Sequence, residues 1–440
     1  LIGDRSCPVR RSVYVYVYAV CLGRRSLASF PSKSHPSPVI LPPPSMFGMG
    51  DGQTESKHHK TPPSPCLLRR HLARLKSSPY ETLLLDGGTG EELFLRGVPD
   101  DRKIWSATAI VHERYHAILE EVHRSFIRSG SQVVTTNSYG IVPGVGFNDG
   151  KEVIHLTSLA GEIARKSVFR GSGDIDKEEQ QALVLGSLGP LVESYRPDLI
   201  MDHDEGVLHF AFPIEGLYKH VDMYIIETSS TTKEAFQAID ALAFFNRSPS
   251  RAPRPLLVSF TLKQNGKIRS DESVVDAIPA IIKYCDERDV EIVGVLFNCC
   301  EPEAIDKALV EIQRNKHIHG FLHHPPSAGN DEPEHDEKNS EHNTKVLLGA
   351  YANRLMPVQE DWTISGSTSP NHFRNDLSPE RYWSDFVRRW CLCHGTGDEE
   401  CLSSLQRRGG LQIVGGCCGI TPGHINVLRN GLSKSNTEKR

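Results

Sequence analysis

The sequence lacks the features that mark several large classes of protein. None of its apolar runs is long enough to span a bilayer as a helix, and its net charge of −5 shows no basic excess of the kind that nucleic-acid-binding proteins carry. Eleven cysteines in 440 residues do not resemble a small disulfide scaffold, and no Cys-x-x-Cys redox motif occurs. We therefore expect a cytoplasmic protein whose partners are neither a membrane nor a nucleic acid.

The first 78 residues differ from the rest of the chain in composition. They are basic and rich in Ser and Pro, and an apolar stretch at 13–20 lies between pairs of arginines. A stretch of this kind is typical of a signal or transit peptide, in which case an organelle is the expected location. We expect residues 1–78 to be a disordered extension outside the folded domain, with a targeting segment as the alternative.

From residue 79 to residue 433, short apolar runs alternate with helical patterns. The runs are nearly continuous in their apolar character, as in parallel strands buried on both faces. We predict strands at 82–86, 132–136, 183–187, 223–227, 256–260, 292–297, 346–351 and 411–415, and helices at 112–129, 232–245, 272–288, 303–314 and 379–389. Eight such units predict an α/β fold, the TIM (β/α)8 barrel. An open doubly wound sheet is the alternative, although the glycines at 87–90 lack the dinucleotide-binding spacing.

Two polar segments interrupt this alternation. Residues 323–345 are charged and contain a run of acidic residues, and they precede a predicted strand. We expect a disordered insertion on the barrel face opposite the active site. Residues 391–409 hold Cys391, Cys393, His394 and Cys401, which resemble a zinc knuckle in composition. Their spacing is unusual and no second pair matches them, so we predict no metal site there.

Two adjacent cysteines, Cys417 and Cys418, follow the last predicted strand and are surrounded by glycines. Neighbouring side chains on a regular strand point to opposite faces, so the two thiols converge only where glycine lets the backbone leave strand geometry. Cys299 follows the predicted strand at 292–297, and the carboxyl ends of barrel strands open on one face. Three thiolates with an open fourth position are typical of catalytic Zn²⁺ sites, which deprotonate an incoming thiol. Buried structural cysteines and a redox pair are the alternatives.

Two acidic residues stand at the ends of other predicted strands. Asp86 precedes a glycine-rich loop whose backbone N–H groups can hold a carboxylate at the start of a helix. Asp86 itself and Glu227 are candidate partners for an ammonium group. Together with the thiol site, these features predict a thiol-bearing amino acid as the substrate. The alternative roles are a helix N-cap for Asp86 and a structural salt bridge for Glu227.

Seven short motifs occur at or near these strand ends. In chain order they are Asp86-Gly87-Gly88-Thr89-Gly90, Trp105-Ser106-Ala107, Thr135-Thr136-Asn137-Ser138-Tyr139, Gly186-Ser187-Leu188-Gly189-Pro190, Glu227-Thr228, Asn298-Cys299 followed by Pro302, and Gly415-Gly416-Cys417-Cys418-Gly419. Taken together, from about residue 79 to residue 432, they resemble the homocysteine S-methyltransferases. The resemblance implies a zinc-dependent barrel that transfers a methyl group to homocysteine and yields methionine.

The resemblance also implies roles for individual residues. Those expected to bind zinc are Cys299, Cys417 and Cys418. Those expected to bind homocysteine are Asp86 and Glu227 at its amino group, Gly87 and Gly88 beside its carboxylate, and Thr136 and Asn298. An aromatic residue at the position of Trp105 lies near the methyl donor in the betaine-using branch, and we expect Trp105 and Tyr139 to hold a cationic donor by cation–π contact.

The chain departs from the family pattern at several positions. Cys300 follows the expected zinc ligand and can compete for the metal, and the segment at 136–140 does not match the betaine branch closely. We therefore predict S-methylmethionine or S-adenosylmethionine as the donor, with betaine as the alternative. A non-catalytic zinc-binding scaffold or sensor, and a methyltransferase that acts on another thiol or on selenohomocysteine, are further alternatives. The sequence does not define an oligomeric state.

Overall fold

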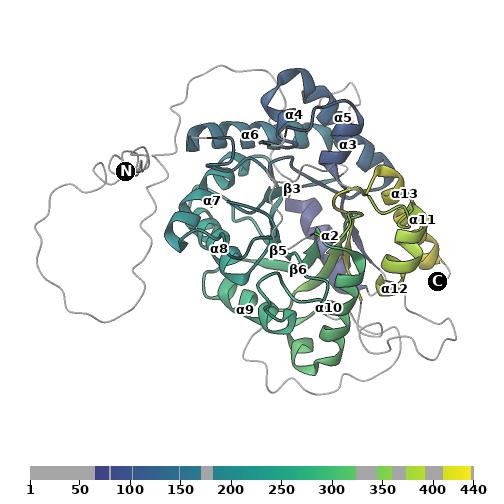
Figure 1. Ribbon diagram of the computed structural model, residues 1–440. Helices are drawn as coiled ribbons and strands as arrows, with labels where there is room; N and C mark the ends of the chain where they lie inside the picture. Colours follow the sequence, from purple (N-terminus) through teal and green to yellow (C-terminus); the bar gives the residue numbers. More distant parts are fainter. Residues whose placement is uncertain are drawn as a thin grey trace, which may run out of the picture. The chain divides into compact units, whose positions relative to one another are not determined.

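The computed structural model describes residues 65–78, 81–101, 103–147, 149–169, 182–323, 344–358, 373–391 and 410–437. All of them belong to one compact unit, which spans residues 57–440. Eight parallel strands form its sheet in the order β1-β8-β7-β6-β5-β4-β3-β2 (Figure 1). They are β1 (Leu83–Leu84), β2 (Val133–Thr135), β3 (Leu183–Leu188), β4 (Met223–Ser229), β5 (Leu256–Phe260), β6 (Ile292–Asn298), β7 (Leu347–Tyr351) and β8 (Ile413–Val414).

The two ends of this sheet meet between β1 and β2. The Gln132 N–H donates to the Leu84 carbonyl oxygen at 2.8 Å, and the Leu84 N–H donates to Oε1 of Gln132 at 2.9 Å. A side chain thus replaces a backbone partner in one of these two bonds, so the barrel is nearly closed. The predicted TIM (β/α)8 barrel is confirmed, and each predicted strand is present, although the first, second and last are shorter than expected.

Helices surround the barrel in Figure 1. Those expected from the sequence are α5 (His116–Ser129), α8 (Thr232–Asn246), α9 (Val274–Asp286), α10 (Pro302–Arg314) and the continuous run of α11 (Pro379–Arg381), η5 (Tyr382–Val387) and α12 (Arg388–Cys391). The start of the helix predicted at 112–129 is η2 (Glu113–Tyr115), and the helix expected after the glycine-rich loop is α3 (Thr89–Leu95). No range was predicted for α2 (Pro65–Ser77), α4 (Thr108–Val111), α6 (Gly150–Ser167), α7 (His203–Leu217), η4 (Lys316–Phe321) and α13 (Pro422–Thr437).

A wide helical turn positions one tyrosine behind the end of β8. The η5 segment is π-helical, a geometry that often re-aims a side chain near a functional site. The fully buried Tyr382 donates from its hydroxyl to the Gly415 carbonyl oxygen at 2.8 Å, and that hydroxyl accepts from the Ala352 N–H at 3.1 Å. Tyr382 therefore joins the chain segments that leave β7 and β8.

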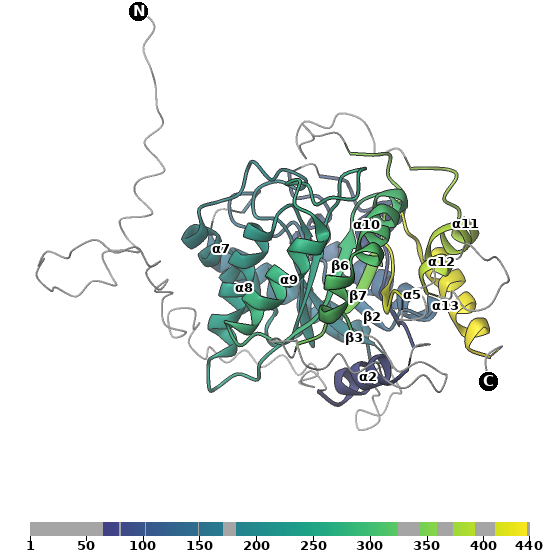
Figure 2. The same cartoon turned by 90° about the horizontal axis from the view of Figure 1, so that it is seen from below.

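The helix α2 corrects the prediction that residues 1–78 lie outside the fold. Leu68 and Leu75 belong to the core formed by the inward-facing residues of the strands, and the Gln412 side chain donates to the Leu75 carbonyl oxygen at 3.1 Å. Figure 2 shows α2 at one end of the barrel. Burying a leucine contributes roughly 1.5–3 kcal/mol, which stabilises this contact. Composition averaged over 78 residues concealed a short amphipathic helix within a Ser- and Pro-rich segment.

The two predicted insertions lie mostly outside the described residues, at 324–343 and 392–409. Cys393, His394 and Cys401 are among the residues that are not described. The ends of the first insertion join before β7, where the His323 N–H donates to the Val346 carbonyl oxygen at 2.8 Å. Of the second, Cys391 is described, and its thiol faces the Leu411 carbonyl oxygen at 3.5 Å.

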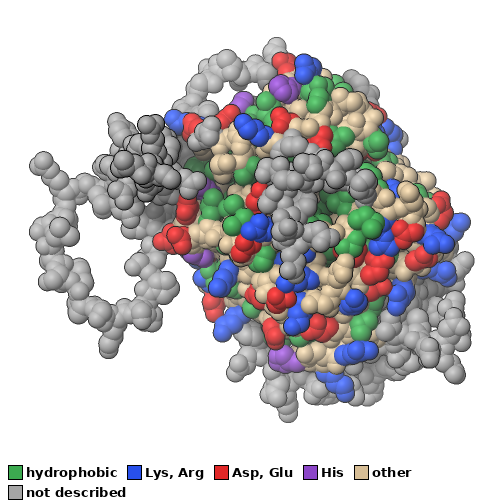
Figure 3. All heavy atoms as spheres, viewed as in Figure 1, with side chains coloured by type: hydrophobic (Ala, Val, Ile, Leu, Met, Phe, Trp, Pro, Cys, Tyr) green, Lys and Arg blue, Asp and Glu red, His purple; other side chains and the backbone are tan. Residues whose placement is uncertain are grey.

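The lengths of the helices and the charges on the surface bear on the partners expected from the sequence. Among the described residues, no helix has both the length and the apolar character needed to cross a bilayer. On the face shown in Figure 3, the described Lys and Arg side chains are interspersed with Asp and Glu, and no continuous basic area is visible.

Candidate active site

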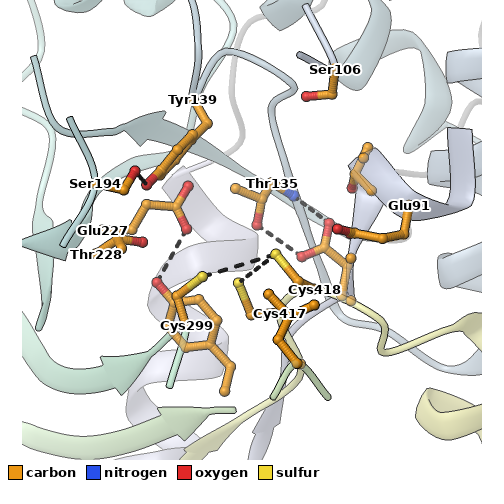
Figure 4. Close-up of a pocket in the computed structure, with 18 of the residues that line it drawn as sticks. Glu91, Ser106, Thr135, Tyr139, Ser194, Glu227, Thr228, Cys299, Cys417 and Cys418 are labelled. Atoms are coloured by element: carbon orange, nitrogen blue, oxygen red, sulfur yellow. Dashed lines mark hydrogen bonds between the residues drawn. The ribbon is translucent and has the colours of Figure 1, made fainter. Parts of the chain in front are cut away.

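A cavity of about 400 Å³ opens at the carboxyl ends of the strands. Its wall includes residues that follow β1, β2, β3, β6 and β8, residues in the second half of β4, and the loop at 355–358 after β7 (Figure 4). In a (β/α)8 barrel this end carries the chemistry. Most of the residues singled out from the sequence line the cavity: Asp86, Gly87, Gly88, Trp105, Thr136, Tyr139, Glu227, Cys299, Cys417 and Cys418.

Three cysteine sulfurs meet in this cavity. The Sγ atom of Cys418 lies 3.9 Å from that of Cys299 and 3.9 Å from that of Cys417, and all three sulfurs lie within 4.8 Å of one another. Sulfur ligands 2.3 Å from a tetrahedral zinc ion lie about 3.8 Å apart. The spacing of the thiols therefore fits one metal ion with three protein ligands.

The backbone leaves strand geometry at both places that supply these thiols. Cys299 has a φ of 52°, a left-handed conformation that is rare outside glycine and is often retained at functional sites. After β8, Gly419 has a φ of 78°, and the Ile420 N–H donates to the Cys417 carbonyl oxygen at 3.0 Å. This turn is what allows Cys417 and Cys418 to converge, as the glycines around them predicted.

The three thiols share charge unequally. Hydrogen bonds from the thiols of Cys417 and Cys418, and from the Tyr195 hydroxyl, lower the pKa of Cys299 well below its usual value. The Tyr195 oxygen lies 2.9 Å from the sulfur of Cys299. The Cys299 thiolate in turn raises the pKa of the other two thiols. Without a metal, Cys299 is thus the thiol of the cluster whose ionisation is favoured over that of the other two.

Cys300 does not join this cluster. It is not among the described residues that line the cavity or group around a metal position. Burial raises the pKa of its thiol, and its carbonyl oxygen accepts from the Asn353 N–H at 3.1 Å. Its side chain leaves the strand end in a different direction from that of Cys299, so the predicted competition for the metal is not supported by this geometry.

Asp86 is held by the end of the neighbouring strand. The Thr135 N–H donates to its Oδ2 atom at 2.7 Å, and the Thr135 hydroxyl donates to Oδ1 at 2.8 Å. Burial raises the pKa of Asp86 to about 6, and the two bonds from Thr135 oppose that rise. The carboxyl group caps no helix, since the helix that follows has Gly88 at its N-cap and no side-chain capping bond.

In Figure 4, Glu227 lies on the opposite side of the cavity from Glu91, and the sulfurs of Cys417 and Cys418 lie between them. The hydroxyl of Ser187 donates a short hydrogen bond to its carboxyl group, and the hydroxyl of Tyr351 donates another at 3.3 Å. Burial raises the pKa of Glu227 to about 7. Among the described residues no salt bridge involves Glu227, so a structural ion pair does not account for it.

The glycines after Asp86 are required by a close approach of two loops. A Cβ atom on Gly87 would lie 2.2 Å from the Ile420 carbonyl oxygen, and the Gly88 N–H donates to that oxygen at 2.8 Å. A Cβ atom on Gly88 would lie 2.9 Å from Oε2 of Glu91. The Gly88 amide is therefore engaged within the protein, while Gly87 and Gly88 both line the cavity, and their place beside a substrate carboxylate stays a prediction.

Asn298 was predicted to bind substrate, but it does not line the cavity. It is fully buried behind the Glu227-Thr228 turn. Its Oδ1 atom accepts from the Thr228 N–H at 2.9 Å and the Ser259 hydroxyl at 2.7 Å, while its Nδ2 donates to Oγ1 of Thr228 at 2.9 Å. Thr228 has a φ of 60°, so Asn298 holds a strained turn in place and acts as a positioning residue.

Thr136 lines the cavity but its hydroxyl is engaged inside the protein. It lies 2.8 Å from the Ser138 hydroxyl and accepts from the Ser187 N–H at 3.0 Å. Trp105 and Tyr139 form one wall of the cavity, with ring centroids 6.0 Å apart in an edge-to-face arrangement. The Tyr139 hydroxyl lies 2.7 Å from that of Ser194. Both aromatic residues expected to hold a cationic donor therefore line the cavity, and their role in donor binding stays a prediction.

The match to known families follows this geometry. Residues 83–432 match the family model described as homocysteine S-methyltransferase. The chain belongs to the homocysteine S-methyltransferase family. This is a family of methyltransferases, and the resemblance identified from the motifs is confirmed.

Several relatives in this family are distant. The chain is 23% identical to the homocysteine S-methyltransferase of Escherichia coli, over 79% of this chain and 94% of that protein. It is 22% identical to homocysteine S-methyltransferase 1 of Zea mays, over 78% of this chain and 92% of that protein. The match to methionine synthase of Mycobacterium leprae, 22% identical over 82% of this chain, covers 25% of that protein.

The fold also resembles that of a solved structure. The crystal structure of the metallated form of the Escherichia coli homocysteine methyltransferase MmuM aligns with a TM-score of 0.55 and 21% sequence identity. The alignment covers 83% of this chain and 99% of that one. The likeness supports the barrel fold of this family member.

Sequence reasoning missed several residues of the cavity. Tyr195 and Glu91 both line it, as do Tyr351 and the loop at 355–358. Tyr195 has a φ of 67° and lies well past the end of β3, so only the folded chain brings it to Cys299. Glu91 directly follows the glycine-rich motif at 86–90, and its burial is what distinguishes it: the side chain is 7% exposed, and burial raises its pKa to about 7.

Proposed function

We propose that this protein transfers a methyl group from a cationic sulfonium donor to the thiol of homocysteine, and that the reaction depends on Zn²⁺ held by Cys299, Cys417 and Cys418. The observation that carries the proposal is the cluster of three sulfurs within 4.8 Å in a cavity that also holds two buried carboxyl groups. Soft thiolate ligands select zinc, and three protein ligands leave one position open. When bound, zinc would lower the pKa of an incoming thiol so that it reacts as a thiolate.

Homocysteine would be oriented by the two carboxyl groups. With its sulfur at the cysteine cluster, its ammonium group would be received by Asp86 and Glu227. A carboxylate has about four lone-pair positions, so the two bonds that Asp86 accepts from Thr135 leave capacity for an ammonium. Burial raises the pKa of both acids, and a bound cation would favour their charged forms.

The donor would lie along the aromatic wall. The rings of Trp105 and Tyr139 can hold a positive centre by cation–π contact, with the methyl carbon facing the homocysteine sulfur. The sulfur attacks the methyl carbon, a carbon–sulfur bond forms, and the bond to the donor sulfonium breaks with its electron pair left on the donor sulfur. The products are methionine and a neutral thioether. The thiol proton would pass to solvent through the open cavity before this step, so the methyl transfer itself requires no further general base.

A panel of donors tests the proposal. The zinc-loaded protein is incubated with homocysteine and S-methylmethionine, S-adenosylmethionine or betaine, and methionine is measured. We expect methionine with a sulfonium donor. Turnover with betaine alone would transfer the donor assignment to that branch. Bound zinc with no methionine from any donor would instead favour a scaffold or sensor.

A further inference from the structure

Glu91 is the acidic residue of the cavity that the proposed chemistry leaves unused. It belongs to α3 and is 7% exposed, and it lines the cavity close to Cys418 and Gly419. Among the described residues, neither of its carboxyl oxygens has a hydrogen-bond partner. Asp86 and Glu227, by contrast, each accept two hydrogen bonds. Glu91 is thus a buried carboxyl group without a hydrogen-bond partner of ordinary geometry, although the Cys418 thiol and the Gly419 N–H lie close enough to oppose the rise in its pKa.

Such a group calls for a ligand. A buried carboxyl group without a partner costs on the order of 1–3 kcal/mol, and more when it is charged. No described Lys, Arg or His lies in an ion pair with Glu91, whereas its neighbour Glu92 binds Arg96 at 2.7 Å. The metal does not account for Glu91 either, because the group of potential ligands within 4.8 Å consists of the three cysteines alone in the described part of the chain.

The position of Glu91 assigns it to the donor side of the cavity. Figure 4 shows Glu91 and Glu227 on opposite sides of the site, with the sulfurs of Cys417 and Cys418 below and between them. Gly90, next to Glu91, packs against Trp105 so closely that a Cβ atom on Gly90 would lie 2.9 Å from the indole ring. Glu91 therefore lies beside the aromatic wall and away from the carboxyl group of Glu227.

We propose that Glu91 binds the positively charged centre of the methyl donor and so determines which donors are accepted. This inference rests on the proposed function. The methyl carbon must approach to about 3–3.5 Å from the homocysteine sulfur, which places the sulfonium near the cysteine cluster, where Glu91 lies. A carboxylate at this place provides a counter-charge that the cation–π contacts of Trp105 do not supply.

The proposal makes a distinct kinetic prediction. Methyl transfer neutralises the sulfonium, so the attraction to Glu91 is stronger in the ground state than in the transition state. An interaction of this kind lowers KM for the donor without raising kcat. In Glu91→Gln we expect KM for the sulfonium donor to rise about tenfold or more, because the loss of about 1.4 kcal/mol of attraction between the two charges corresponds to a factor of ten. We expect kcat to be unchanged or higher, and KM for homocysteine to be unchanged.

Glu91 also bears on the class of donor. In betaine the carboxylate is one carbon from the quaternary nitrogen, so a donor of this kind brings a negative charge towards Glu91. In S-methylmethionine the carboxylate is separated from the sulfonium by three carbons and can lie further away. The ratio of kcat/KM for the sulfonium donor to that for betaine should therefore fall in Glu91→Gln.

The test compares Glu91→Gln with Glu92→Gln, a matched change on the same helix whose carboxylate faces Arg96 rather than the cavity. KM and kcat are measured for both substrates, and binding of S-methylmethionine without homocysteine is measured by calorimetry. Weaker donor binding in Glu91→Gln alone supports the proposal. An unchanged donor affinity, or a rise in KM for homocysteine instead, overturns it.

Two control measurements and one further variant distinguish a loss of donor binding from a loss of folding or of zinc. Zinc content and melting temperature show whether Glu91→Gln is folded and loaded, and Glu91→Asp, which retracts the charge by one carbon, should bind the donor with intermediate affinity. If the wild-type protein transfers no methyl group but Glu91→Gln still weakens the binding of S-methylmethionine, the proposed function fails, and Glu91 remains a binding residue for a sulfonium compound. If the wild-type protein transfers the methyl group and Glu91→Gln has the same affinity and the same KM for the donor, only this inference fails.

Discussion

The hydroxyl group of Tyr195 lies 2.9 Å from the sulfur of Cys299. A phenol facing a thiolate can only donate, so this contact stabilises the negative charge on Cys299. Above the same ring, the guanidinium carbon of Arg269 lies 5.0 Å from the ring centroid and its Nη2 faces the Val358 carbonyl oxygen at 3.4 Å. Tyr195 thus connects the cysteine cluster with the loop that closes one side of the cavity.

Removing this hydroxyl should raise the pKa of Cys299. A hydrogen bond to a charged group contributes about 1.5–3 kcal/mol, which corresponds to roughly one to two pKa units. In metal-free Tyr195→Phe we expect thiolate absorbance in the ultraviolet to develop at higher pH than in the wild type. Tyr139→Phe is the control, because its hydroxyl faces Ser194. Equal titration curves for both variants would show that Tyr195 does not donate to Cys299.

The cysteines provide a matched pair of substitutions. Cys417→Ser should lose bound zinc, whereas Cys300→Ser should retain about one equivalent, because the Cys300 thiol is not part of the cluster. Metal analysis after dialysis against a weak chelator measures both. Retention of zinc and full activity in Cys417→Ser would contradict the assignment of the ligands, and loss of zinc in Cys300→Ser would give Cys300 a role at the metal.

Replacing Asn298 should lower the stability of the fold more than it lowers the rate of the reaction. Its amide makes three hydrogen bonds that hold the Glu227-Thr228 turn and Ser259. Asn298→Ala leaves buried partners unsatisfied, and we expect a loss of about 2–4 kcal/mol in the free energy of unfolding. Urea denaturation measures it. Because the turn carries Glu227, KM for homocysteine should rise as well, while the donor KM stays within about twofold.

The carboxyl group of Glu227 makes stability depend on pH in the ligand-free protein. Burial raises its pKa from 4.5 to about 7, so the folded state favours the protonated acid. That contribution is fully present below pH 4.5 and is lost as pH rises through 7. Glu227→Gln carries no such proton, so its stability relative to the wild type should increase by up to about 3 kcal/mol between pH 4.5 and pH 7.5.

Denaturation curves of both proteins, in the same buffers and without homocysteine or metal, measure this difference. A gap between them that does not change over this range would show that Glu227 titrates at its ordinary pKa. Addition of homocysteine should raise the free energy of unfolding of the wild type more than that of Glu227→Gln, because the substrate ammonium would favour the charged form of Glu227.

The contact between α2 and the barrel is open to a direct test. Leu75 is 2% exposed within the core, and Leu75→Ala should cost about 2–5 kcal/mol. Leu72, which is only partly buried at the same contact, is the control and should cost less when replaced by alanine. Thermal unfolding monitored by circular dichroism compares the two variants. Equal and small losses would mean that α2 contributes little to the stability of the barrel.

The sequence was sufficient to predict the barrel, its functional end and the cysteine cluster. Buried parallel strands are recognisable from their apolar runs. The residues that follow these strands lie at the same end of the barrel, so the sequence alone was enough to place Cys299 and Cys417 together. Asn298 shows where this reasoning ends. It is adjacent to a cavity residue, but successive side chains at a strand end point in different directions, and only the structure gives the direction.

Glu91 and Tyr195 could not be assigned for another reason. The role of Tyr195 depends on its contact with Cys299, and the role of Glu91 depends on the lack of a hydrogen-bond partner for its carboxyl group among the described residues. Both follow from how distant parts of the chain pack together. A glutamate in the first turn of a helix is ordinary in sequence, and its isolation follows only from the packing of the loop at 417–420 over Gly87 and Gly88. The helix α2 was missed because its apolar face has a partner only in the folded protein, where it packs against the end of the barrel at which β8 begins.

The spacing of the cysteines along the chain has a mechanical consequence. Cys299 and Cys418 are 119 residues apart, and that stretch contains β7 and both polar insertions. A metal ion at the cluster would act as a cross-link that fastens the last quarter of the barrel to β6. The entropy of closing such a loop grows only by about 0.6 kcal/mol for each doubling of its length. A single metal ion could therefore hold the segment between Cys299 and Cys418 in place, with its two long insertions, while the shape of the cavity stays the same.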